Sequence, residues 1–100
     1  MSHGHTNVII RYEALSYYLG MPRRTVPDRD AKRFGAIIRR LRDQRGWTLV
    51  EFGRKADMNP TYLGFLERGE NVPTLTVVLS LAKLFGEKAS DLIREIEDNV

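Results

Sequence analysis

The stretch TLVEFGRKADMNPTYLGFLERG, residues 48–69, decides the fold of this chain. It predicts two short helices joined by a tight turn. Thr48 and Glu51 have the spacing of a capping box, which begins the first helix. Asn59 is suited to cap the second helix. Pro60 suits the first position of that helix, where a missing N–H has no helical partner anyway.

The junction between the two helices carries matching residue types. Asp57 is expected at the turn, because Asp tolerates positive φ better than most residues. Gly53 has no side chain, so a second helix can approach it closely, and Gly69 ends the second helix as a left-handed cap. The pattern predicts a helix-turn-helix. Its apolar side consists of Phe52, Ala56, Met58, Leu63 and Leu66.

The span from about Phe34 to Leu92 resembles the lambda-repressor-like, XRE-type helix-turn-helix family. Within it, TYLGFLERGENVP resembles the small controller proteins of restriction–modification systems. The matching residues are Leu41-Arg42, Gly46-Trp47-Thr48, Tyr62-Leu63-Gly64, Glu67-Arg68-Gly69, Pro73-Thr74, Leu81-Ala82, Leu84 and Gly86. The resemblance implies an all-α, five-helix DNA-binding domain. Two positions depart from the family pattern: many members carry Gln in place of Leu49, and often a basic or polar residue in place of Phe65.

Length and composition are those of a small globular protein. One hundred residues suit one domain, and 42% hydrophobic residues are enough for a modest core. The chain has no cysteine, no apolar run long enough to span a membrane, and no signal-peptide pattern at its beginning. We therefore expect a soluble cytoplasmic protein.

Charge is unevenly distributed along the chain. From Arg29 to Lys55 the balance is +6, whereas from Gly86 to Val100 it is −3. A basic half and an acidic tail indicate either a polyanion-binding surface with a separate association surface, or two solvated helix faces.

Residues 1–27 are expected to form an extension, and residues 28–100 the helix-turn-helix domain. In the extension, apolar residues at helical spacing predict a short amphipathic helix that ends near Gly20. It would pack on the domain, reach a second subunit, or contact DNA as an arm through Arg23 and Arg24. His3 and His5 are interpreted as part of a chain end and not as metal ligands.

Three further helices are predicted around the central pair. The first begins at Asp28 or Asp30, ends near Arg45, and has a core-facing stripe. That stripe is Phe34, Ile37, Ile38 and Leu41. Thr74 and Gly86 bound the second, and the third begins near Ala89 or Ser90. Trp47 is expected to cover an edge of the core. No segment has the alternation of a strand.

The family resemblance implies that the second helix of the motif lies in the major groove of DNA. Thr61 is then the best-placed base reader, while Asn59 is largely committed to capping. Phe65 could pack on thymine methyls or on a protein partner, or lie partly in the core. Tyr62 is either a core-edge residue or a phosphate donor. The residues expected to reach phosphates are Arg45, Arg54, Lys55, Tyr62, Arg68 and Asn71.

These patterns favour binding over catalysis, since no catalytic, cofactor or metal motif lies in the domain. The first hypothesis is a homodimeric transcriptional regulator that reads a short palindromic operator in double-stranded DNA. Its dimer interface is expected on the last helix, at Leu92, Ile93 and Ile96, with Val72 and Leu75 nearby. The second hypothesis is a helix-turn-helix that binds a protein partner, as an antitoxin or antiactivator does. Leu49, Gly64 and Phe65 favour it.

Overall fold

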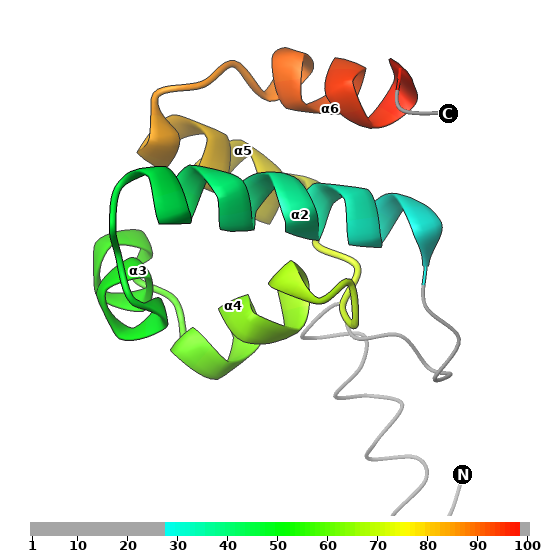
Figure 1. Cartoon of the computed structure of the whole chain (residues 1–100). Coiled ribbons are helices and arrows are strands. Elements are labelled where there is room, and N and C mark those ends of the chain that lie inside the picture. The colour runs from blue at the N-terminus through cyan, green and yellow to red at the C-terminus, as the bar shows by residue number, and fades with distance from the viewer. Residues whose placement is uncertain (1–27, 99–100) are drawn as a thin grey trace, which may run out of the picture.

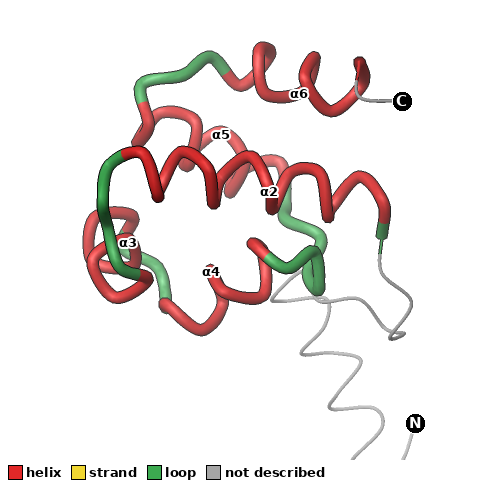
Figure 2. The backbone as a smooth tube through the Cα atoms, in the orientation of Figure 1, coloured by secondary structure: helices red, strands yellow, loops and turns green. Residues whose placement is uncertain are grey.

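The computed structural model describes residues 28–98, which form five helices and no strands (Figure 2). The helices are α2 (Arg29–Gln44), α3 (Leu49–Ala56), α4 (Pro60–Glu67), α5 (Leu75–Phe85) and α6 (Ala89–Asp98). The predicted all-α, five-helix domain is confirmed for this part of the chain. The predicted helix or arm at residues 1–27 lies outside the described residues.

Local signals set the helix boundaries as expected. Asp28 caps α2 by accepting a hydrogen bond from the N–H of Ala31 at 2.9 Å. Thr74 caps α5 in the same way, and Gly86 ends α5 in the left-handed region at φ 71°. These caps satisfy backbone groups that have no partner within the helix, so each helix begins and ends at a defined residue.

Helix α2 lies between α6 and the α3–α4 pair, with α5 behind it in Figure 1. Its predicted stripe is buried, and Ile38 is fully inaccessible to solvent. The stripe belongs to one hydrophobic core with residues from the four other helices, among them Phe52, Leu63, Leu81 and Leu92. One core therefore supports both helices of the central motif.

Trp47 closes one edge of this core, as predicted. Its ring is stacked on Phe85, with the centroids 5.8 Å apart, and lies 6.4 Å from the Phe52 ring. Phe52 and Phe85 also contact each other at 5.4 Å. This aromatic cluster joins the beginning of α3 to the end of α5, and aromatic pairs of this kind stabilise a core beyond their buried area.

Candidate nucleic-acid interface

Helices α3 and α4 meet at a turn as tight as predicted. Asp57 has φ 56° and ψ 46°, and the N–H of Met58 donates to the carbonyl of Gly53 at 2.9 Å. A Cβ at Gly53 would lie 2.7 Å from the Met58 carbonyl oxygen and 2.8 Å from Cγ of Pro60. Only glycine allows so close an approach, so Gly53 sets the distance between the two helices.

Both helices of the pair begin at the predicted caps. The Glu51 N–H donates to the Thr48 hydroxyl at 3.1 Å, and the Thr48 N–H donates to the Glu51 carboxylate at 2.8 Å. The second bond holds the pKa of Glu51 below its usual value. At α4, Oδ1 of Asn59 accepts from the Thr61 N–H at 2.7 Å. The side-chain oxygen Oδ1 of Asn59, which could otherwise accept a hydrogen bond from a base, therefore already accepts one in the helix cap.

An ion pair anchors the inner side of α4 to α2. The Arg42 guanidinium donates to both carboxylate oxygens of Glu67, at 2.6 and 2.9 Å, and to the carbonyl of Trp47 at 2.8 Å. The two side chains are only 12% and 5% exposed. Bonding to Glu67 raises the pKa of Arg42. This pair therefore joins the end of α4 to α2.

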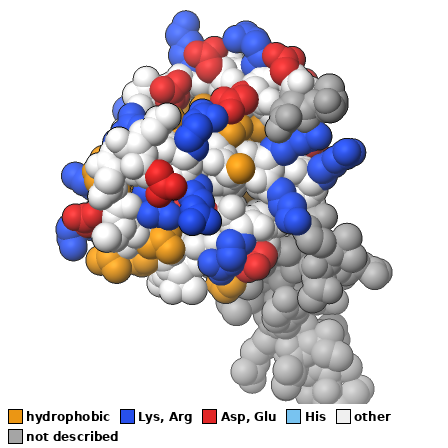
Figure 3. All heavy atoms as spheres, viewed as in Figure 1, with side chains coloured by type: hydrophobic (Ala, Val, Ile, Leu, Met, Phe, Trp, Pro, Cys, Tyr) orange, Lys and Arg blue, Asp and Glu red, His pale blue; other side chains and the backbone are white. Residues whose placement is uncertain are grey.

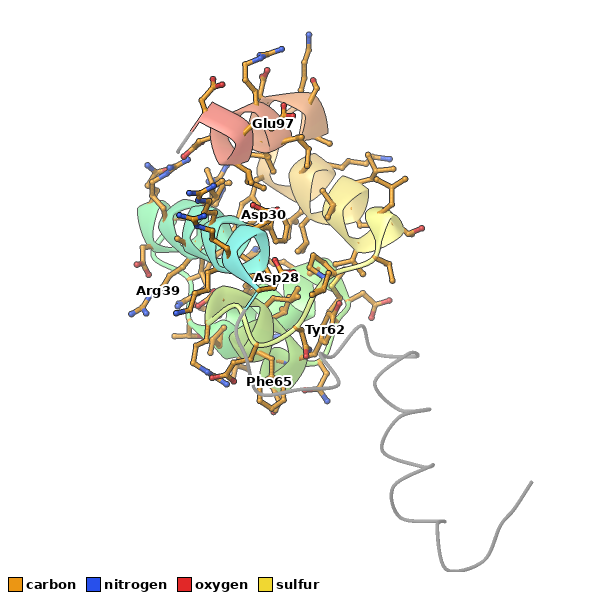
Figure 4. The ribbon with its side chains drawn as sticks, turned by 90° about the vertical axis from the view of Figure 1, so that its right-hand side faces the viewer. Asp28, Asp30, Arg39, Tyr62, Phe65 and Glu97 are labelled. Atoms are coloured by element: carbon orange, nitrogen blue, oxygen red, sulfur yellow. The ribbon has the colours of Figure 1, made fainter. Side chains whose placement is uncertain are left out.

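The outer side of α4 presents three side chains in one row. Thr61, Phe65 and Arg68 follow the spacing i, i+4 and i+7, which places them on the same face. Figure 4 shows Phe65 on the outer side of α4, at the end of the domain opposite α6. Thr61 and Arg68 are exposed and Phe65 is half-buried. The guanidinium of Arg68 lies 5.2 Å from the Phe65 ring centre, and its Nε lies 3.2 Å from a carboxylate oxygen of Glu70.

Gly64 of α4 is buried within the helix pair. A Cβ there would lie 3.6 Å from Cδ1 of Leu49 and 3.2 Å from a guanidinium nitrogen of Arg68. The first distance is an ordinary van der Waals contact, and the second is to the end of a flexible side chain. Leu49, half-buried against the core, occupies the position where many family members carry Gln.

The predicted phosphate-binding residues differ in availability. Arg54 and Lys55 are exposed in the last turn of α3, and the Lys55 ammonium lies 5.1 Å from the centre of the Trp47 ring. Tyr62 is half-buried, and burial raises its pKa, so the phenol stays protonated at neutral pH and can donate a hydrogen bond. These three residues, like Arg68, remain predictions as phosphate contacts.

One predicted phosphate contact, Asn71, requires correction, and another, Arg45, also bonds within the domain. Asn71 is only 1% exposed, so its side chain does not reach the surface. Its carboxamide has no hydrogen-bond partner among the described residues. Arg45 donates to the carbonyls of Leu41 at 3.0 Å and Phe85 at 2.7 Å. Its guanidinium also lies 4.9 Å from the Phe85 ring centre. Arg45 thus helps to cap α5, and because its side chain is exposed it stays a prediction as a phosphate contact.

The predicted association surface also requires correction. Leu92 is 2% exposed and belongs to the core, and Ile96 is half-buried against it. Of the three predicted residues, only Ile93 is well exposed, at 41%. Three other large apolar side chains are exposed on or just before α5: Val72, Leu75 and Leu79, at 43%, 72% and 51%, of which Val72 and Leu75 were expected near the interface. We call Val72, Leu75 and Leu79 the α5 apolar strip.

The described residues contain no cluster of three or more His, Asp or Glu side chains placed to hold a metal ion. None of the five helices is both long and apolar enough to cross a membrane. His3 and His5 lie outside the described residues.

Comparison with known proteins identifies the class that this fold and site define. Residues 38–92 match the helix-turn-helix family model, which covers more than half of the chain. The chain belongs to the XRE-type helix-turn-helix family, a family of DNA-binding transcription regulators. The family assignment confirms the expected helix-turn-helix family.

Individual relatives narrow the comparison. The chain is 37% identical over 60 residues to the HTH-type transcriptional regulator DdrOP3 of Deinococcus deserti. That match covers 60% of this chain and 46% of the relative, so the chain spans less than half of the relative's length. The fold is similar to two crystal structures of the clp gene regulator ClgR from Corynebacterium glutamicum, each with a TM-score of 0.63. The first is 27% identical in sequence, and the match covers 71% of this chain and 92% of that structure's chain. The second is 28% identical, and the match covers 69% of this chain and 73% of that structure's chain.

Proposed function

We propose that this protein is a sequence-specific transcriptional regulator that binds a short palindromic operator as a homodimer. The observation that carries the proposal is the outer row of α4, Thr61, Phe65 and Arg68, on a helix that the Arg42–Glu67 ion pair joins to α2. In this geometry α4 enters the major groove and α3 crosses the DNA backbone. Residues 28–100 are then the DNA-binding domain, residues 1–27 an extension, and the site of action the cytoplasm.

In this proposal, different residues position the protein and read the sequence. Arg54, Lys55 and Arg68 are exposed cations at the ends of α3 and α4, where they can neutralise phosphates. Tyr62 adds a hydroxyl donor. Thr61, in the first turn of α4, offers a hydroxyl and a methyl group to base edges. Affinity therefore depends on the cations, and specificity on the first turns of α4.

Two alanine variants separate these roles. Arg68→Ala is expected to weaken binding to all duplexes together, and to reduce the slope of log K against log salt by about 0.9 because one phosphate contact is lost. Thr61→Ala is expected to leave the slope of log K against log salt unchanged. It should reduce the difference in binding free energy between operator and random DNA by about 1–3 kcal/mol. Fluorescence anisotropy titrations at several salt concentrations measure both effects. Identical behaviour of the two variants would contradict the assignment.

The α5 apolar strip supports the homodimer. Leu75 and Leu79 lie one helical turn apart on α5 and are more than half exposed. Such a surface is suited to a second copy of the chain, and a two-fold axis would place two α4 helices about 34 Å apart on one face of DNA. The exposed Ile93 on α6 is proposed to belong to the same interface.

Leu79→Asp is expected to produce a monomer at concentrations where the wild-type protein is dimeric, because a charge placed in an apolar interface loses its hydration. Sedimentation velocity at tens of micromolar measures the mass. Ser80→Asp is the matched control, since it adds the same charge at the next exposed position of α5. A monomeric wild-type protein, or a Leu79→Asp variant of unchanged mass, would rule out this interface.

A protein partner is the second candidate for the outer surface of α3 and α4. It is favoured by Val50, which is 59% exposed, and by the half-buried Phe65. It predicts that Phe65→Ala abolishes partner binding and that neither Arg68 nor Thr61 affects any DNA affinity. The cations around these apolar residues favour DNA.

A further inference from the structure

We propose that the outer face of α4 recognises the 5-methyl group of pyrimidines, so that thymines opposite Thr61 and Phe65 define each operator half-site. The inference rests on the proposed DNA-binding function and names the chemistry by which that site distinguishes sequences. It makes Phe65 a specificity-determining residue.

The first step is that α4 has few groups able to pair with purine edges. The usual bidentate readers are Asn or Gln for adenine and Arg or Lys for guanine, whereas the Thr61 hydroxyl can make only single hydrogen bonds. Asn59 precedes the helix, and its oxygen already accepts from the Thr61 N–H at 2.7 Å. Arg68 follows the helix at its C-terminal cap, where Glu70 holds its Nε at 3.2 Å. The middle of the row therefore contains no purine reader.

The second step is that the middle of the row is apolar. Phe65 lies one turn after Thr61, so its ring and the Thr61 methyl are neighbours on one face. The Arg68 guanidinium lies over the Phe65 ring at 5.2 Å and covers one side of it. In the major groove the thymine methyl is the apolar group that distinguishes A·T from the other pairs. An apolar ring beside a methyl group is complementary to it.

The third step is the charge that surrounds this apolar row. On α3, exposed Val50 and Arg54 are four residues apart and share a face, and Arg68 ends the row on α4. Figure 3 shows hydrophobic side chains over α3 and the start of α4, with Lys and Arg beside them. Cations at the border of an apolar surface match a groove that has phosphates at its edges and methyl groups on its floor.

The test replaces thymine by deoxyuridine, which pairs identically but lacks the methyl group. Duplexes are first recovered from a random library with the full chain, and each thymine of the half-site is then replaced in turn. At one or two positions the Kd of the wild-type protein should rise about fourfold, the change that one buried methyl carbon produces. A deoxyuridine outside the half-site is the matched control and should change nothing.

Two further measurements assign the effect to Phe65. In Phe65→Ala, thymine and deoxyuridine should bind equally well at the sensitive position. When a cytosine replaces the thymine at that position, methylation of its carbon 5 should raise the affinity of the wild-type protein for the duplex about fourfold. The wild-type comparisons do not depend on the folding of any variant.

Sequence-specific binding that no deoxyuridine alters would overturn this inference and leave the regulator function standing. A sensitive position that persists unchanged in Phe65→Ala would also overturn the role of Phe65. Absence of any DNA affinity, even at low salt, would overturn the proposed function and with it this inference. The function favoured by that result is binding of an apolar protein partner.

Discussion

Glu67→Ala will lower the free energy of unfolding by about 3–5 kcal/mol, which is the usual cost of removing one partner from a buried ion pair. Glu67 is 5% exposed, and its carboxylate accepts two hydrogen bonds from Arg42. Alanine would leave the Arg42 guanidinium with the Trp47 carbonyl at 2.8 Å and the exposed Asp43 carboxylate at 3.8 Å as its remaining partners. Urea denaturation followed by circular dichroism measures the change.

A second ion pair provides a matched control. Arg40 on α2 also donates to both carboxylate oxygens of a glutamate, Glu95 on α6, at 2.6 and 3.3 Å. These side chains are 47% and 43% exposed, so water screens the pair. Glu95→Ala should therefore cost below about 1 kcal/mol. Equal losses in the two variants would show that burial does not govern the strength of the Arg42–Glu67 pair.

The second large effect is expected at Gly35, where α2 crosses α4. A Cβ at this position would lie 2.5 Å from the Glu67 carbonyl oxygen and 2.8 Å from its carbonyl carbon, and would also overlap the Leu66 carbonyl oxygen. These are backbone atoms of α4, which cannot rotate away as a side chain can. We expect Gly35→Ala to cost about 3 kcal/mol or more, at the upper end of overpacking effects.

The sign of the change makes this a sharp test. Helix propensity alone predicts that Gly35→Ala in the interior of α2 stabilises the protein by up to about 1 kcal/mol. The neighbouring Ala36 is exposed, so Ala36→Gly measures the propensity term without the contact. A Gly35→Ala variant as stable as the wild-type protein would contradict the close crossing of α2 and α4.

Much of the fold could be predicted from the sequence because its signals are local. The capping box at Thr48 and the left-handed turn at Asp57 depend on residues within one helical turn. The core stripe of α2 follows from helical spacing, and all four predicted residues are buried. Such features need no knowledge of which helix packs on which.

The errors concern positions where distant segments decide the environment. Leu92 and Leu75 have similar side chains, yet Leu92 is 2% exposed and Leu75 is 72% exposed, because α6 turns the former toward α2 and α5. Asn71 is polar and follows α4, but its loop packs inward, as the neighbouring Gly69 shows: a Cβ there would lie 2.7 Å from Cα of Lys32. No local pattern carries this information.

The same limit applies to the candidate site. The row of Thr61, Phe65 and Arg68 could be predicted from helical spacing once α4 was located. The use of Arg45 at the end of α5 could not, since its partner Phe85 lies 40 residues away in sequence. The role of Gly35 was missed for the same reason, because it depends on the backbone of α4.

The central claim is that the outer row of α4 binds DNA and discriminates among sequences. The most direct test is a titration of the full chain with a duplex recovered from a random library and with a scrambled duplex, between about 50 and 200 mM salt. We predict an affinity at least about 10³-fold higher for the recovered duplex than for the scrambled one. We also predict that log K falls linearly with the logarithm of the salt concentration, with a slope of about −0.9 for each phosphate contact. No affinity at about 50 mM salt, or equal affinity for both duplexes, would contradict it.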